Sequence, residues 1–447
     1  MSLKRFRYSG LGDLLDHERI CDIERSFNPG SVMHRVKISF LILLLSTSTH
    51  AQESYSILAD KTFSTTTGVE NLLTIDRVAY TFENRLLLST WFNENTVAGK
   101  TMGISYRLGK TVLLDAVFDE YVSLVQHEVY GHGARAREYG ASDITYSLNL
   151  SFPYGSSLGV TSCVFPPDKP MSSDQVLLFD VGGVEANAML SKHLVLNWLQ
   201  RGAINYRETL LYTRASNDLT QYLWRTKWGI HSAEGNDMLA YEADINQREG
   251  HFDPSDYKIT VNDLAKQVLV IGLDPFQYYS LYTYFESYLY SAQETFAFPM
   301  IELGSFKYLP SFHLGLTPFG SEVYFENYFV HSAKVGELYF RYGIPTFHRS
   351  WGIGFYGTNI IESDPFSFDI GANVWNQPVV STYDYNVSES KGGLGGSMSC
   401  TAYLKLAETF ATVCLMGEVE TKTMGYVQGE PLSDAMILRV GLRFIPR

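Results

Sequence analysis

The sequence lacks several features by which common functional classes are identified. It has no basic stripe, and its formal net charge of −13 argues against a nucleic-acid partner. It contains no G-x-S-x-G elbow that would present a nucleophilic serine, and no glycine-rich phosphate loop following a strand. None of its predicted helices contains 18 continuous apolar residues, so the sequence predicts no transmembrane helix.

Cysteine is also scarce, at 4 of 447 residues. Cys400 and Cys414 stand symmetrically about Ala407, as partners across a hairpin would, and an oxidising compartment would permit a disulfide between them. Two separate small hydrophobic side chains are the equally weighted alternative, because the geometry of a cross-strand disulfide is demanding. Cys163 has no evident partner in the sequence.

Aromatic residues, in contrast, are abundant. They make up 14% of the chain, with 30 Tyr and 27 Phe, which suits β-strands and especially strands with aromatic girdles. A chain of 447 residues can bury a large core. We expect two domains, with one large β-rich domain as the alternative.

The N-terminal region predicts export. Residues 33–51 have the layout of a secretory signal peptide, with a basic start, a short apolar run and small or polar residues ending at Ala51. Residues 1–32 then lie upstream of a self-sufficient signal and are interpreted as a mis-assigned start; a cytosolic tail with a weak anchor is the alternative. We therefore expect an exported protein in the periplasm or outer membrane of a Gram-negative bacterium.

The remaining chain predicts an α+β fold. Residues 52–302 are expected to be mainly helical, with apolar residues recurring at spacings of three and four and with Ser-Ser-Asp capping a long helix that ends at Gly202. Residues 303–447 change to a period of two, as in "FSFDIGANVW" and "MILRVGLRF", which predicts an antiparallel sheet of roughly eight strands.

The end of this β region is similar to the last strand of bacterial outer-membrane β-barrels, and the resemblance implies possible contact with outer-membrane lipid. The sequence departs from that pattern, because it continues as Ile445-Pro446-Arg447 where such barrels usually end on an aromatic residue. A soluble sheet or sandwich is the alternative of equal weight.

The stretch "HEVYGHG" contains the candidate metal-binding residues. His127 and His132 are five residues apart, so on a regular helix their side chains would point about 140° apart. A local π-bulge absorbs one extra residue and brings both rings to one face, and such bulges cluster at functional sites. Gly131 and Gly133 make the loosening easier. The spacing therefore predicts a metal site that depends on a helix defect.

The motif resembles the H-E-x-x-G-H zinc site of the dipeptidyl peptidase III family, in which a Glu on a later helix is the third ligand. The resemblance covers "HEVYGHG" and one Glu, Glu185, which lies 53 residues after His132. It implies that His127, His132 and Glu185 bind Zn²⁺ and that Glu128 is the general base. Outside these residues nothing in the chain is similar to that family.

Two imidazoles and one carboxylate leave zinc with an open position for water, and a neighbouring carboxylate can take the proton as that water attacks a carbonyl. The substrate would be a peptide or another amide or ester. Tyr241 or His231 is the candidate for oxyanion stabilisation. Candidates for orienting the imidazoles are Asp119, Glu120, Asp180 and Asp237.

Each of these assignments has a simpler alternative. Glu185 could pair with Arg135 or Arg137, and Gly182-Gly183 is interpreted as a close helix-packing contact. The competing hypothesis for the whole chain is a non-catalytic outer-membrane barrel or envelope scaffold with a structural HEVYGH helix. An enzyme requires His127, His132 and a carboxylate to converge, whereas a scaffold does not.

Overall fold

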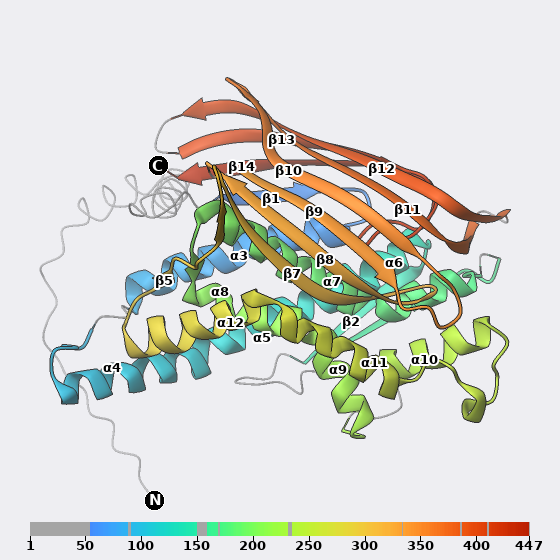
Figure 1. Ribbon diagram of the computed structural model, residues 1–447, viewed down its shortest axis with the longest axis horizontal. Helices are drawn as coiled ribbons and strands as arrows, with labels where there is room; N and C mark the ends of the chain where they lie inside the picture. The colour runs from blue at the N-terminus through green and yellow to red at the C-terminus, as the bar shows by residue number, and fades with distance from the viewer. Residues whose placement is uncertain are drawn as a thin grey trace, which may run out of the picture. The chain divides into compact units, whose positions relative to one another are not determined.

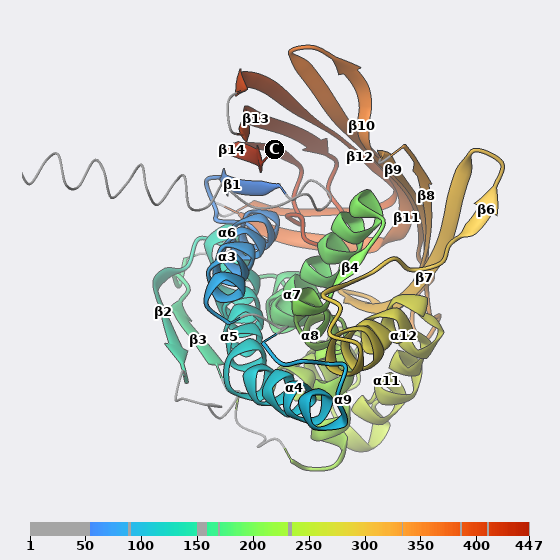
Figure 2. The ribbon, with the colours of Figure 1, turned by 90° about the vertical axis from the view of Figure 1, so that its left-hand side faces the viewer.

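Helices and a large sheet form two layers, which the computed structural model shows in Figures 1 and 2. The helical and strand regions belong to one unit, Thr49–Arg447. The predicted signal peptide, the segment upstream of it and His231 lie outside the described residues. The described residues are 54–87, 91–149, 159–168, 170–230, 235–332, 334–384, 387–408 and 411–446.

The first layer contains the helices, and three of its segments are π-helical (η1, η2 and η5). The first half of the layer comprises α3 (Thr65–Leu86), α4 (Val97–Lys110), η1 (Thr111–Asp115), α5 (Ala116–His127), η2 (Glu128–His132), α6 (Gly133–Glu138) and α7 (Ser173–Arg201). The second half comprises α8 (Tyr206–Ser216), α9 (Asp218–Lys227), α10 (Asp237–Arg248), η3 (Pro254–Asp256), α11 (Val261–Gln267), η4 (Val268–Leu273), α12 (Pro275–Tyr282) and η5 (Thr283–Tyr290).

The second layer is a ten-stranded sheet in the order β1-β14-β13-β12-β11-β10-β9-β8-β7-β6, with every neighbouring pair antiparallel. Two short pairs, β2 with β3 and β4 with β5, lie outside it. The strands are β1 (Tyr55–Ala59), β2 (Ser142–Leu148), β3 (Gly159–Val164), β4 (Ile204–Asn205), β5 (Thr295–Phe296), β6 (Ile301–Leu303), β7 (Phe306–Thr317), β8 (Gly320–His331), β9 (Lys334–Gly343), β10 (Trp351–Ser363), β11 (Phe366–Asp384), β12 (Val387–Glu408), β13 (Ala411–Lys422) and β14 (Ala435–Pro446).

The predicted α+β class is confirmed, and the change from helices to strands falls where the sequence period changes. The possible closure into a barrel is not found in the part of the chain that the structure describes, because β1 and β6 are the two edge strands and do not pair with each other. Among those same residues, no helix combines the length and apolar character needed to cross a membrane.

Helix α7 joins the two layers. Ser172 and Gln175 form a capping box at its start, and Gly202 ends it in the left-handed conformation with φ of 70°. The helix contacts β7, β9 and β11 on the sheet and α5, α8 and α10 in the helical layer. Apolar side chains along its length enter both large core clusters. The predicted cap and end of this helix are confirmed.

Of the two alternatives for Cys400 and Cys414, separate side chains are found and not a disulfide, since Cys163, Cys400 and Cys414 are all free. The turn between β12 and β13 is not centred on Ala407, so Cys400 pairs with Val419 and Cys414 with Lys405. Cys400 is exposed whereas Cys414 is buried on the opposite face of the sheet. The symmetric placing of Cys400 and Cys414 about Ala407 therefore does not put the two side chains on the same face of the sheet.

Candidate metal centre

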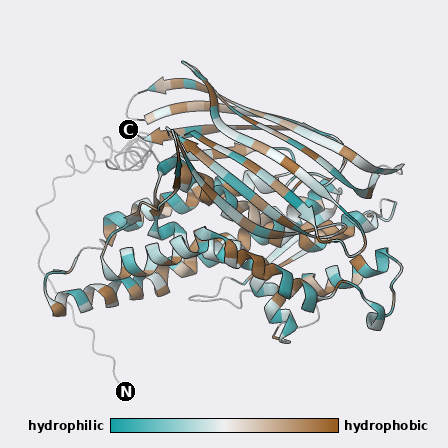
Figure 3. Ribbon diagram, in the orientation of Figure 1, coloured by the Kyte–Doolittle hydropathy of each residue, from teal (hydrophilic) through white to brown (hydrophobic). Residues whose placement is uncertain are grey.

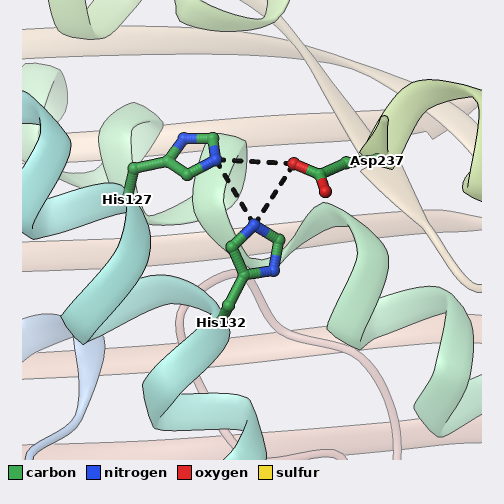
Figure 4. A group of neighbouring side chains, drawn as sticks. All are labelled: His127, His132 and Asp237. Atoms are coloured by element: carbon green, nitrogen blue, oxygen red, sulfur yellow. Dashed lines mark hydrogen bonds and ion pairs between the residues drawn. The ribbon is translucent and has the colours of Figure 1, made fainter. Parts of the chain in front are cut away.

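A π-helical segment brings the two histidines together. Helix α5 passes directly into η2, where the Gly133 N–H donates to the Glu128 carbonyl in an i to i+5 bond. The Nε2 atoms of His127 and His132 lie 3.3 Å apart (Figure 4). The predicted helix defect is confirmed, and it gives the two rings a common face.

Glycines allow η2 and α7 to approach closely at this point. A Cβ at Gly183 would lie 2.2 Å from His127 Nε2, and one at Gly131 would lie 2.6 Å from the Gly182 carbonyl oxygen. Real Cβ atoms do not approach neighbours this closely, so side chains at these positions would push the helices apart. The packing role that the sequence suggests for Gly182-Gly183 is confirmed, and the imidazole of His127 occupies the space that Gly183 leaves.

Asp237 supplies the carboxylate. It begins α10, where the side chain of Asn236 caps the helix. Asp237 Oδ2 lies 3.5 Å from His127 Nε2 and 3.2 Å from His132 Nε2. The three atoms therefore form a nearly equilateral triangle, and Figure 4 shows all three side chains pointing toward its centre.

The size of this triangle is compatible with a bound metal ion. Zinc bonds of about 2.0–2.1 Å at tetrahedral angles separate neighbouring ligand atoms by about 3.3 Å. An octahedral site with bonds of about 2.1 Å would separate them by about 3.0 Å. The measured edges of 3.3, 3.5 and 3.2 Å agree better with the tetrahedral value.

The outer nitrogens of both rings are held by acceptors. His127 Nδ1 donates to Asp218 Oδ2 at 2.9 Å, and His132 Nδ1 donates to the Phe179 carbonyl oxygen at 2.7 Å. Asn187 donates to the same Asp218 oxygen at 2.8 Å. These bonds fix one proton on each Nδ1 and turn both Nε2 atoms toward the triangle, which is the orientation that metal-binding histidines have.

The charges in the site are strongly coupled. Burial disfavours a charged imidazole, yet Asp218 and Asp237 outweigh that effect and raise the pKa of His127; Asp237 likewise raises the pKa of His132. Burial would raise the pKa of Asp237, but the two histidines lower it below its usual value. A cation is therefore favoured between these side chains, and a metal ion would replace the protons.

Glu128 lies beside the triangle in an adjoining cleft of about 280 Å³, which His127 and His132 also line. The Thr161 hydroxyl of β3 donates to Glu128 Oε2 at 2.7 Å and holds the carboxylate in place. A Cβ at Gly159 would lie 2.4 Å from the Glu128 side chain, so a larger residue there would require the Glu128 side chain to shift. The cleft is further lined by Arg214, Arg225 and Tyr222.

The structure places Glu185 away from the triangle. Its carboxylate accepts from Arg135 Nη2 at 2.6 Å and from the Gly429 N–H at 2.7 Å, so it has the structural role given as its alternative. The third position belongs to Asp237, which the sequence suggested only as an outer partner. No motif identified Asp218, which stands at the start of α9.

The other predicted residues also have different roles. Tyr241 is fully buried and donates to the Thr317 carbonyl oxygen, so its hydroxyl does not reach the cleft. Asp119 pairs with Arg207 and Glu120 with Arg214. Asp180 faces Asp244, and burial together with this second carboxyl raises the pKa of Asp180 to about 9.

The chain matches no protein-family model, no curated protein and no solved structure.

Proposed function

We propose that the protein is an exported zinc-dependent hydrolase that cleaves peptide bonds or other amide or ester bonds. The observation that carries the proposal is the triangle of His127 Nε2, His132 Nε2 and Asp237 Oδ2, whose edges fit tetrahedral zinc. The orienting acceptors on both Nδ1 atoms support it, because they turn both Nε2 atoms toward one point.

His127 Nε2, His132 Nε2 and Asp237 Oδ2 would hold the zinc and leave room for a water or a substrate oxygen beside it. A zinc ion held there would lower the pKa of water and polarise a carbonyl group. Glu128 is the general base: it follows the first ligand directly in the chain, and its carboxylate is fixed by Thr161 at the side of the cleft. It accepts the proton of the attacking water and returns it to the leaving group.

The competing hypothesis of a non-catalytic scaffold does not explain this convergence. A structural HEVYGH helix needs no carboxylate brought from α10 to its two histidines. A buried group of two histidines and one aspartate, opening into a cleft with a further carboxylate, supports hydrolysis.

Metal content of the purified full-length chain tests the proposal, using inductively coupled plasma mass spectrometry. We expect about one zinc per chain in the wild type, and loss of zinc in His132→Ala and Asp237→Ala. His193→Ala is the matched control, because this histidine lies on α7 and pairs with Glu70 away from the triangle; it should retain zinc. Iron in place of zinc, or zinc retained in Asp237→Ala, would contradict the assignment.

A second step separates binding from catalysis. Glu128→Gln should keep its zinc and lose at least about 100-fold in the rate of hydrolysis of a peptide library. Equal turnover by Glu128→Gln and the wild type would exclude Glu128 as the base. Export is tested by fractionating cells that express the full chain, with the protein expected in the envelope fraction.

A further inference from the structure

The two faces of the large sheet have opposite polarity. Side chains alternate along each strand, and Figure 3 shows apolar and polar residues alternating along β9 to β14. We call the residues of these strands that point away from the helices the outer band. It comprises Phe340 and Tyr342 (β9), Trp351, Ile353 and Phe355 (β10), Phe366, Phe368, Ile370, Ala372 and Val374 (β11), Met398, Cys400, Ala402 and Leu404 (β12), Val413, Leu415, Gly417 and Val419 (β13), and Met436, Leu438, Val440, Leu442 and Phe444 (β14).

The alternate positions of the same strands face the helices and carry the charges. Arg439 lies between Leu438 and Val440, is 1% exposed, and pairs with Glu418 and Glu430. Arg341, between Phe340 and Tyr342, pairs with Glu322 at 2.8 Å. The sheet therefore buries its ion pairs and exposes its hydrocarbon, which is the reverse of a sheet with one face in water.

The exposed apolar area is too large to be incidental. Met398 is 67% exposed, Met436 68% and Val440 63%. A dozen large side chains at about half exposure present on the order of 1,000 Å² of apolar surface, whereas monomeric soluble proteins rarely expose contiguous apolar patches beyond a few hundred Å². This face must be covered in the working protein.

Apolar exposure also continues beyond the sheet. Past the edge strand β6, where Ile301 is exposed, the helical segments α12 and η5 expose Tyr278, Leu281 and Phe285. Figures 1 and 2 show α12 below the sheet, on a different side of the molecule from the outer band. One protein partner of standard size covers about 800 Å² of a single face. The acyl chains of a membrane can cover both the outer band and the exposed side chains of α12 and η5.

The outer band has the strand length of a membrane-spanning sheet, for which about 9–11 residues are needed. In β14 it runs from Met436 to Phe444, roughly 27 Å at about 3.4 Å per residue. Membrane-facing bands of sheets are about 25 Å tall and have aromatic residues near their borders. Tyr342 and Trp351 pair directly at one end of the band. Exposed ion pairs stand at the strand ends, Lys334 with Glu362 and Lys391 with Asp434.

The backbone groups on the outer edge of β1 are hydrogen-bonded, as contact with a membrane interior would require. Asn71 and Thr74 of α3 bond the backbone N–H and carbonyl groups of Ser56 and Leu58 at 2.6–2.9 Å. These side chains replace a neighbouring strand and leave the edge without open backbone groups at those residues, which an apolar phase would not tolerate.

We propose that the outer band and the exposed flank of α12 and η5 contact the acyl chains of a membrane. The helical layer and its metal cleft then lie against the sheet's other face. A lipid is favoured over a protein partner because interfaces between proteins pair polar groups about once per 100–200 Å², and the outer band offers no charged side chain for such pairing.

Flotation of the full-length chain with phosphatidylcholine vesicles tests the proposal. We expect the wild type to float with the vesicles, and the double variant Leu438→Lys, Val440→Lys to lose at least about tenfold in partitioning, because charged residues on a lipid-facing strand are strongly disfavoured. The matched control is Trp228→Lys, Phe252→Lys, which places two lysines at equally exposed apolar positions outside the band; it should float as the wild type does.

A second measurement does not depend on folding of the lysine variant. Cys400 is an exposed member of the outer band, so it can carry an environment-sensitive fluorophore in a chain with Cys21→Ser and Cys163→Ser; Cys414 is buried. A blue shift of the label on addition of vesicles is expected. Wild-type protein that stays at the bottom of the gradient, or a label that responds only to dimerisation measured by light scattering, would overturn the proposal. Zinc content is a separate readout, so failure here leaves the metal site untouched.

Discussion

The histidine site in the helical layer and the inner face of the sheet bury their polar groups for different reasons. In the helical layer, buried charges such as Arg207 and Asp119 pair with each other, whereas His127, His132 and Asp237 direct three possible ligand atoms at one point. In the sheet, the inward charges are paired with one another, and apolar groups point outward. The comparison teaches that buried polar groups indicate a functional site when several of them point at one common position. They indicate a structural role when each is paired with an oppositely charged neighbour.

The largest effect is expected inside the sheet, from Arg439→Leu. This substitution leaves Glu418 and Glu430 without their buried partner and should destabilise the fold by roughly 3–5 kcal/mol. Guanidinium unfolding in detergent, followed by circular dichroism, measures the loss. The neighbouring outward change Leu438→Gln should stay within about 0.5 kcal/mol. Equal losses at both positions would remove the distinction between the two faces.

In the helical layer, Gly183→Ala should weaken zinc binding by about 100-fold. Its Cβ would meet the His127 ring and displace Nε2 from the triangle. Competition with a fluorescent chelator measures the affinity. Gly109→Ala is the matched control, because a Cβ there meets nothing within 4 Å. Unchanged affinity in Gly183→Ala would show that the close approach of α7 does not position the ring.

A smaller effect is expected from Asp218→Asn, because it weakens the acceptor behind His127 without removing a ligand. Loss of such an outer partner typically lowers metal affinity 10–100-fold. Asp263→Asn, an exposed aspartate near the start of α11, serves as the control in the same titration. If the two variants bind zinc equally well, the bond between His127 and Asp218 has no part in holding the metal.

The smallest effect concerns Asp180. Burial and Asp244 raise its pKa to about 9 in the folded chain, against an ordinary value of 3.8. The folded state therefore holds a proton that the unfolded chain releases, so wild-type stability falls as pH rises between these values. Asp180→Asn removes this dependence and should raise the free energy of unfolding of the zinc-free protein at pH 8 by on the order of 1 kcal/mol, and by less at pH 5. A gain of the same size at both pH values would argue against the raised pKa.

Local patterns predicted the local structure well. The five-residue spacing of His127 and His132 predicted the π-helical turn, and the capping residues and Gly202 predicted the bounds of α7. The change of period near residue 303 predicted the sheet. Each of these features is decided by residues close together in the chain, which is where sequence patterns carry information.

The remaining assignments depended on tertiary contacts that no local pattern contains. Glu185 is on a suitable helix, but its carboxylate accepts hydrogen bonds from Arg135 and from the backbone N–H of Gly429, which is 244 residues away in the chain. Asp237 reaches the site only because α10 packs against α7. Cys400 and Cys414 do not lie opposite each other for a related reason. The position of the turn decides which residues of β12 and β13 share a face, and the sequence does not give that position.

The pairing of β1 with β14 has a kinetic consequence. Tyr55 lies opposite Phe444, so the first described strand finds its only sheet neighbour almost four hundred positions later in the chain. Contacts so distant in sequence form late and slowly. Strand β1 leads into α3, and α3 packs against η2, which contains His132. The packing around η2 can therefore be completed only after β14 has been synthesised. A ribosome-bound chain lacking that strand would carry the metal-binding motif before its surroundings exist, and would be exposed to proteases and chaperones until the two ends meet.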